Sequence, residues 1–352
     1  MRQIGADRAH AISGGSRDVL VGVLDTRVHA DNPDLAPNID RANSVSCAEG
    51  VPDTAPQAWT APPDATFQHA TAVSGIIAAA SNDVGITGVA PNVRIAAIAI
   101  AVDGGMTYPE QVICGYVWAA EHGVDVTNAS FFADPWVRWC DDDPDQAAGA
   151  EAMRRAIDYA AAHDVVNVAA IGNTNWDLSH PVVDQHSPDN GEPVERLTGD
   201  NCTQVPAEVP GVLTVSGVGA QQRKAQYSAY GIRDTDVAAP SGDPNQIPDT
   251  PDANPGILTP VNSHEWAYFG GTSAAAPHAA GVVALVRSTH PEWSARQVQA
   301  EVRRDADRLP CPPGGVFDPD GTGAWLAYCE GGRSGRGFYG AGLVDALAAV
   351  TR

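Results

Sequence analysis

Five short apolar runs, rich in valine, isoleucine and alanine, are spaced along this chain, and none of them alternates apolar with polar residues. Strands that are apolar on both sides must be covered on both faces, as in a parallel sheet that lies between two layers of helices. Segments with helical periodicity separate the runs. The sequence therefore predicts an α/β fold of three layers with a mainly parallel central sheet. Strands are expected over residues 18–25, 93–101, 124–130, 165–171 and 212–218, and helices over 70–80, 109–122, 147–163, 273–289, 294–305 and 343–350.

Size and charge narrow the class of protein. The 352 residues are 43% apolar and show neither an internal repeat nor a linker, so we expect one domain over residues 1–352. The formal charge is −22, which argues against a nucleic-acid partner. The longest apolar runs fall far short of the roughly 20 residues that cross a bilayer, so no membrane partner is expected. No apolar leader follows Met1, which leaves a cytoplasmic protein or the mature form of a secreted one.

The six cysteines are far apart and include no C-x-x-C pair of the kind that binds zinc or performs thioredoxin-like chemistry. An even number of such cysteines favours up to three disulfides over free thiols. The pair Cys311 and Cys329 would close a short loop rich in glycine and proline, and it is the one pairing that we predict.

The strongest local motif is the segment G-G-T-S-A-A-A-P-H at residues 270–278, in which Ser273 follows a glycine-rich turn and begins an apolar helix. A serine in this place has main-chain amides and the positive end of the helix dipole beside its hydroxyl. The simpler alternative is an ordinary N-cap serine. Ala275 stands where the G-x-S-x-G motif requires glycine, so the α/β-hydrolase fold is disfavoured.

A serine nucleophile needs a base, and the base needs a group that orients it. Asp25 ends an apolar strand, at the edge where α/β sheets place their sites, although an Asx turn would also explain it. His69 begins a helix, where a capping or surface histidine is the alternative. Asn173 follows another strand and could donate to an oxyanion, or could simply be a turn residue.

The order Asp25, His69, Ser273 along the chain is the order found in subtilisin. Five sequence motifs within residues 19–286 resemble the blocks of subtilisin-like (S8) serine peptidases. They are V-G-V-L-D-T, H-A-T-A-V-S-G-I-I-A, G-V-A-P, A-A-I-G-N and G-T-S-A-A-A-P-H-A-A-G. This resemblance implies a secreted endopeptidase of subtilisin-like fold. Ser273 would be the nucleophile, His69 the base and then the acid, and Asp25 the orienting group. Asn173 and the Ser273 amide would form the oxyanion hole.

The resemblance also implies binding sites. Polypeptides would be the substrates, and a cleaved propeptide or a protein inhibitor would be the partners of a monomeric enzyme. Catalysis would need no cofactor, but a structural calcium is expected at a loop near residues 81–85. Its ligands would be Asp34 and Asn82. Substrate would contact two groups of residues, Ser130, Phe131 and Phe132 in one and Ala170, Ile171 and Gly172 in the other.

The chain also departs from the family pattern. Arg27 and Ala70 stand where family members usually carry glycine, so a repurposed binding protein without activity is one alternative. A peptide ligase or macrocyclase is another, against which Pro277 argues because it is typical of hydrolytic members. An acidic cluster at residues 141–145 either favours basic substrates or is a solvated loop.

Overall fold

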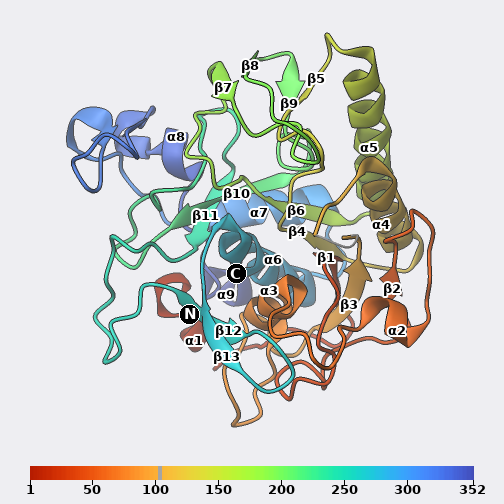
Figure 1. The fold of residues 1–352 in the computed structure, drawn as a ribbon. Helices are drawn as coiled ribbons and strands as arrows, with labels where there is room; N and C mark the ends of the chain where they lie inside the picture. The colour runs from red at the N-terminus through yellow and green to blue at the C-terminus, as the bar shows by residue number, and fades with distance from the viewer. Residues whose placement is uncertain (102–104) are drawn as a thin grey trace.

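Seven parallel strands form one central sheet in the computed structural model, which describes residues 1–101 and 105–352 (Figure 1). The strand order is β11-β10-β6-β4-β1-β3-β2, and every pairing within this sheet is parallel. The predicted mainly parallel sheet is therefore confirmed. In chain order its strands are β1 (Leu20–Asp25), β2 (Val45–Ser46), β3 (Arg94–Ala99), β4 (Val126–Ala129), β6 (Val166–Ala170), β10 (Leu213–Val218) and β11 (Val237–Pro240).

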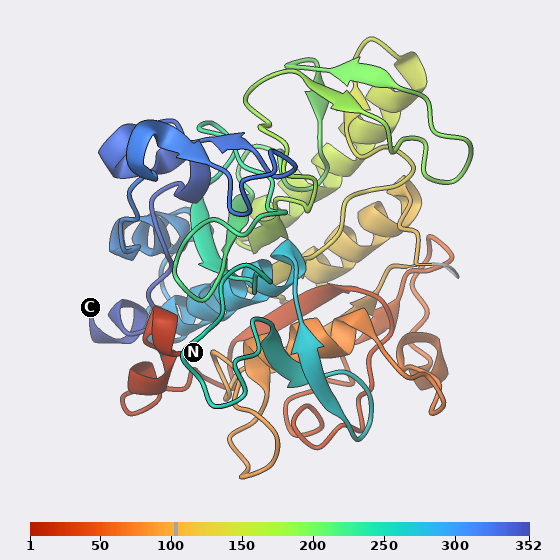
Figure 2. The ribbon, with the colours of Figure 1, turned by 60° about the vertical axis from the view of Figure 1, so that its left-hand side comes forward.

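Each face of the sheet carries its own apolar core because side chains alternate along a strand. On β1, Val21 and Val23 pack into one core, whereas Leu20 and Leu24 pack into the other. Helices cover both faces, which gives the three expected layers (Figures 1 and 2). The first face carries α3 (His69–Ala78), α6 (Thr272–Thr289) and α7 (Ala295–Asp305), and the second carries α4 (Pro109–Glu121) and α5 (Pro144–Ala162).

Two predicted helices have different bounds in the structure. The helix expected over 147–163 begins at Pro144, because the side chain of Asp143 accepts hydrogen bonds from the amides of Asp145 and Gln146. The helix expected over 343–350 is wrong for most of its length. Leu343 forms β-bridges instead, and only α9 (Ala348–Thr351) is helical.

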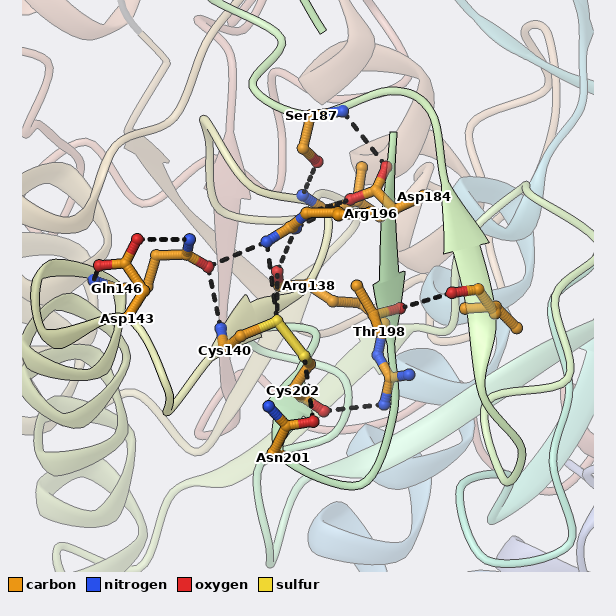
Figure 3. The surroundings of a disulfide bond; sticks show 12 residues. Arg138, Cys140, Asp143, Gln146, Asp184, Ser187, Arg196, Thr198, Asn201 and Cys202 are labelled. Carbon is orange, nitrogen blue, oxygen red and sulfur yellow. Dashed lines mark hydrogen bonds and ion pairs between the residues drawn. A yellow bond between two sulfur atoms is a disulfide. The ribbon is translucent and has the colours of Figure 1, made fainter. Parts of the chain in front are cut away.

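Three disulfides lie outside the central sheet, and the predicted Cys311–Cys329 pair is among them. The other two pairs are Cys47–Cys114 and Cys140–Cys202. The second of these joins β5 (Trp139–Cys140) to β9 (Cys202–Thr203), as Figure 3 shows. None of the described helices is long and apolar enough to span a bilayer. The remaining elements are η1 (Arg2–Ile4), α1 (Ala6–Ala9), α2 (Pro56–Trp59), β7 (Val182–Asp184), β8 (Arg196–Thr198), β12 (Ile257–Pro260), β13 (Trp266–Phe269), η2 (Pro313–Gly315), β14 (Val316–Phe317), β15 (Ala327–Tyr328), η3 (Gly332–Ser334) and α8 (Arg336–Tyr339).

Candidate active site

Asp25 and His69 meet at the carboxyl edge of the sheet. Asp25 is the last residue of β1 and is only 6% exposed, while His69 is the first residue of α3. The Nδ1 atom of His69 lies 2.8 Å from each carboxylate oxygen of Asp25. Thr26 braces the pair, because its amide donates to Asp25 and its hydroxyl accepts a hydrogen bond from the amide of Ala70. Nδ1 is thereby held as the protonated nitrogen, which leaves Nε2 as the basic one.

The environment sets the basicity of His69. Burial disfavours the imidazolium, but the negative charge of Asp25 and its hydrogen bond to the ring outweigh that cost and raise the pKa of His69 above its usual value. The ring also meets Phe269 edge-on, at 5.3 Å between centroids. Nε2 forms no hydrogen bond with the described part of the chain, so it can accept a proton from a neighbouring hydroxyl.

Ser273 lies in the first turn of α6, where amide groups have no partner within the helix. Pro277 lacks the N–H that would bond to the Ser273 carbonyl, and the hydroxyl of Ser130 donates to that carbonyl instead, at 3.3 Å. The Ser273 hydroxyl in turn donates to the Ser130 carbonyl, also at 3.3 Å. In the described structure it therefore makes no hydrogen bond to His69, which differs from the direct pairing implied by the triad. Rotation about one side-chain bond, Cα–Cβ of Ser273, would move the hydroxyl away from the Ser130 carbonyl.

Asn173 is fixed by the residue that precedes the serine. Its Oδ1 accepts hydrogen bonds from the amide of Thr272 at 2.8 Å and from the Thr272 hydroxyl at 3.0 Å. Thr272 is 1% exposed and its hydroxyl also accepts from the amide of Gly172 at 3.2 Å. With the oxygen held in this way, the Nδ2 donor remains without an acceptor among the described residues. The sequence motif contains Thr272, but its anchoring role was not predicted.

A cavity of about 640 Å³ opens beside Ser273. The expected contact residues Ser130, Phe131, Phe132, Ala170 and Gly172 line it, together with Asn173. Ile171 does not line it, because its side chain is fully buried against Leu178 and Ala229. The lining residues that the sequence did not predict include Asp134, His186, Gln204 and Trp325, which come from separate loops.

The two departures from glycine are accommodated without disturbing the site. Ala70 lies inside α3, where a helical residue with a Cβ fits without strain. Arg27 is half-buried, forms no ion pair with the described residues and does not line the cavity. The acidic cluster at 141–145 begins α5 and caps it through Asp143, and none of its members lines the cavity.

The expected calcium ligands lie on neighbouring segments. Asp34 is fully buried, and its Oδ2 accepts hydrogen bonds from the Ile86 amide at 3.0 Å and the Trp266 indole at 2.7 Å. Its Oδ1 has no partner in the described chain, which fits a hard cation. Asn82 fits less well. Its amide nitrogen donates to the Pro33 carbonyl at 2.8 Å, and its oxygen accepts from the Val84 amide at 3.1 Å.

Comparisons with known proteins give the class to which this fold and site belong. The Subtilase family profile matches residues 16–323, so the chain belongs to the subtilase family. It is a serine endopeptidase of the subtilisin type. Subtilisin DY of Bacillus licheniformis is 28% identical over 306 residues, which cover 87% of this chain and 90% of that protein. Subtilisin E of Bacillus subtilis strain 168 is 27% identical over 308 residues, which cover 87% of this chain and 65% of the relative.

Solved structures have the same fold. The epidermin leader peptide processing serine protease of Staphylococcus aureus superposes with a TM-score of 0.73 at 22% identity, covering 98% of this chain and 78% of that one. The nisin leader peptidase NisP of Lactococcus lactis gives a TM-score of 0.71 at 20% identity, covering 97% and 90%. The subtilisin-like fold is thus confirmed over nearly the whole chain.

Proposed function

We propose that this chain hydrolyses peptide bonds through an acyl-enzyme on Ser273, with His69 as the proton carrier and Asp25 as the group that orients it. The observation that carries the proposal is the bond between the Asp25 carboxylate and Nδ1 of His69, at 2.8 Å, on the helix that packs against α6. A histidine held in this tautomer presents a basic Nε2.

The reaction begins when the Ser273 hydroxyl rotates from the Ser130 carbonyl toward His69. Nε2 takes the proton while Oγ forms a bond to the carbonyl carbon of the substrate. The oxyanion receives hydrogen bonds from Nδ2 of Asn173 and from the Ser273 amide. His69 then gives its proton to the leaving amine as the C–N bond breaks. Water attacks the resulting ester with His69 as the base, and Ser273 regains its proton.

The peptide main chain finds its partners in the segment that follows β4. β4 is an interior strand and has no free edge, so the substrate pairs with residues 130–132 just beyond it. Phe131 and Phe132 make no main-chain hydrogen bonds within the described chain, and both line the cavity. An extended peptide can therefore pair with them while its side chain beside the scissile bond enters the cavity next to Ala170 and Gly172.

The setting of the enzyme is part of the proposal. Three disulfides support an oxidising compartment, and we take the protein to act as a secreted monomer whose residues 1–352 form one catalytic domain. A structural calcium at Asp34 would neutralise a buried carboxylate next to α3. Asn82 could contribute only through the remaining lone pair of its amide oxygen.

Incubation with a reduced, carboxymethylated protein tests this function. The wild-type chain is expected to release internal fragments, and Ser273→Ala is expected to release none. The masses of products from a model peptide in the presence of an added amine separate hydrolysis, which adds water, from ligation, which adds the amine. Intact substrate after incubation with a folded wild-type chain would support the inactive binding protein instead.

A further inference from the structure

The cavity beside Ser273 contains an acidic group that the catalytic mechanism does not use. Asp134 lines this cavity and is 6% exposed. It is the only carboxylate among the described residues that line the cavity. Its Oδ2 accepts a hydrogen bond from the amide of Thr107, and its own amide donates to the Thr107 carbonyl at 2.8 Å. The carboxylate is therefore held in place by the main chain.

A second carboxyl group contacts the first. Asp189 lies at hydrogen-bond distance from the carboxyl group of Asp134, and its amide donates to the Pro135 carbonyl at 3.1 Å. Neither residue forms an ion pair in the part of the chain that the structure describes, and Oδ1 of Asp189 is buried without a hydrogen-bond partner there. Two carboxyl groups in contact cannot both ionise without a neighbouring cation.

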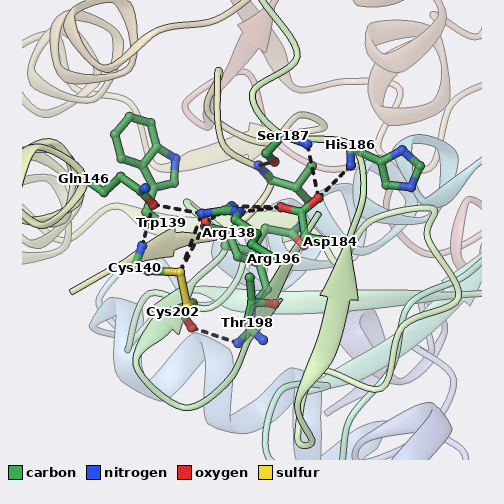
Figure 4. Close-up of polar contacts among 12 residues, drawn as sticks. Arg138, Trp139, Cys140, Gln146, Asp184, His186, Ser187, Arg196, Thr198 and Cys202 are labelled. Carbon is green, nitrogen blue, oxygen red and sulfur yellow. Dashed lines mark hydrogen bonds and ion pairs between the residues drawn. A yellow bond between two sulfur atoms is a disulfide. The ribbon is translucent and has the colours of Figure 1, made fainter. Parts of the chain in front are cut away.

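The segment that carries Asp189 is rigidly anchored. Asp184 is fully buried and accepts hydrogen bonds from the amides of His186 at 2.9 Å and Ser187 at 3.2 Å. Its other oxygen binds Arg196 through Nε at 3.0 Å and Nη2 at 2.8 Å. Arg196 also reaches Gln146 near the Cys140–Cys202 disulfide, as Figures 3 and 4 show. Asp134 is thus a fixed feature of the cavity wall, and Asp189, which contacts it from behind the lining, sits on an anchored segment.

The remaining walls suit a long basic side chain. Phe131, Phe132 and Trp325 offer aromatic faces for an aliphatic stem or a guanidinium plane. Gln204 lines the same cavity, and its side-chain oxygen has no donor in the described structure. The cavity therefore combines hydrogen-bond acceptors and an ionisable carboxyl group with no lysine or arginine among its described lining residues.

We infer that the Asp134–Asp189 pair makes this cavity a subsite for a cationic side chain, arginine or lysine, in the substrate residue whose carbonyl Ser273 attacks. This inference rests on the proposed function, because it names the substrate that the same site takes. The guanidinium or ammonium group supplies the positive charge that the carboxyl pair lacks. Arginine is favoured over lysine because its planar group can donate to Asp134 and Gln204 together.

The protonation state of the carboxyl pair predicts how the preference for a basic side chain depends on pH. Burial and the contact with Asp189 raise the pKa of Asp134 well above its ordinary value. Asp189 is the titratable group that contacts Asp134, and His186 is the other titratable residue among the described residues that line the cavity. Since a carboxylate attracts a cation and a carboxylic acid does not, preference for a basic side chain should increase as pH rises. Asp189→Asn removes the acidic neighbour, so the preference should appear at lower pH.

The test uses peptides that differ only in the residue before the cleaved bond, which is arginine, lysine, methionine or glutamate. We expect kcat/KM to be about 10- to 100-fold higher for arginine than for methionine, as for a hydrogen bond to a charged group. Asp134→Asn keeps an acceptor for the Thr107 amide and should bring arginine within about threefold of methionine while cleavage of the methionine peptide persists. Asp141→Asn makes the same charge change on an exposed residue and should behave like the wild type. Equal kcat/KM for arginine and methionine in the wild type, or a preference that survives in Asp134→Asn, would overturn the inference.

Binding of 4-aminobenzamidine separates this inference from the proposed function, because it needs no catalysis. The wild type and Asp141→Asn should bind this amidine, and Asp134→Asn should bind it at least about tenfold more weakly. Asp134-dependent binding by a chain that cleaves nothing would refute the proposed function and keep the cationic subsite. Binding that is equal in wild type and Asp134→Asn would refute the subsite, whatever the activity.

Discussion

Replacing Asn173 by alanine isolates the oxyanion contribution. Asn173 makes two hydrogen bonds through Oδ1, both to Thr272, and none through Nδ2 to the described chain. The Nδ2 group of Asn173 is therefore available to donate to a group that enters the cavity. Loss of one oxyanion donor costs about 3 to 4 kcal/mol of transition-state stabilisation, so kcat should fall by about 10² to 10³ with KM nearly unchanged.

A second variant should weaken oxyanion stabilisation to a smaller extent. Thr272→Val keeps the shape of the side chain and removes one of the two hydrogen bonds that hold Oδ1, the one at 3.0 Å, together with the acceptor of the Gly172 amide. One neutral hydrogen bond is worth about 1 kcal/mol, which corresponds to a decrease in kcat of about fivefold. Asn173 then remains present but is less firmly positioned, so the loss should be much smaller than in Asn173→Ala.

The assay is steady-state hydrolysis of one peptide by the two variants and by Asn92→Ala, a matched change at an exposed asparagine. Melting temperatures establish that each protein is folded. A rise in KM at constant kcat for Asn173→Ala would mean that the amide binds the ground state and the transition state alike. That result would refute the assignment of Asn173 to the oxyanion.

Three further changes have distinct signatures. Asp25→Asn should lower kcat/KM by about 10⁴ and move its rise with pH to lower pH, because the charge that raises the pKa of His69 is lost; an unchanged pH profile would contradict this. Burial lowers the pKa of Lys224 to about 7, so above that pH the unfolded chain binds more protons than the folded one. Between about pH 7 and 9 the melting temperature of the wild type should therefore rise with pH relative to that of Lys224→Met. Parallel plots of melting temperature against pH for the two proteins would argue against this. A chelator should lower the melting temperature of the wild type but not of Asp34→Asn, and no effect on either would remove the calcium proposal.

The features that could be predicted from the sequence are those encoded locally. Apolar runs without alternation predicted the parallel sheet, because a strand that is buried on both faces has apolar residues at successive positions. The residues at strand ends and helix starts predicted the meeting of Asp25 with His69, since the carboxyl ends of parallel strands share one edge. Helix α6 was predicted because its segment is apolar along most of its length.

The features that could not be predicted depend on contacts between distant segments. Leu343 pairs in β-bridges with Ala238 and Asp307, so the helix expected there forms only near the end of the chain. The Ser273 hydroxyl rests on Ser130, 143 residues away, and a side-chain rotation of this kind leaves no trace in sequence. Trp325 reaches the cavity from a loop that follows the last residue matched by the family profile.

The sequence left the role of one acidic feature open and did not indicate another. The cluster at 141–145 was considered for substrate charge, but Asp143 caps a helix, and the D-P step at Asp143 and Pro144 was a local signal of that cap. Asp134 is the carboxyl group that lines the cavity in the described structure. Its partner Asp189 is distant in sequence, and no spacing rule connects the two.

The most direct test of the central claim, that Asp25 and His69 turn Ser273 into a nucleophile, is labelling with a fluorophosphonate followed by peptide mapping. The wild-type chain should take up one label per molecule, on Ser273. His69→Ala should react about 10³-fold more slowly or worse, because the hydroxyl has lost its base. Labelling at another residue, or labelling of Ser273 at the same rate in His69→Ala, would contradict the account.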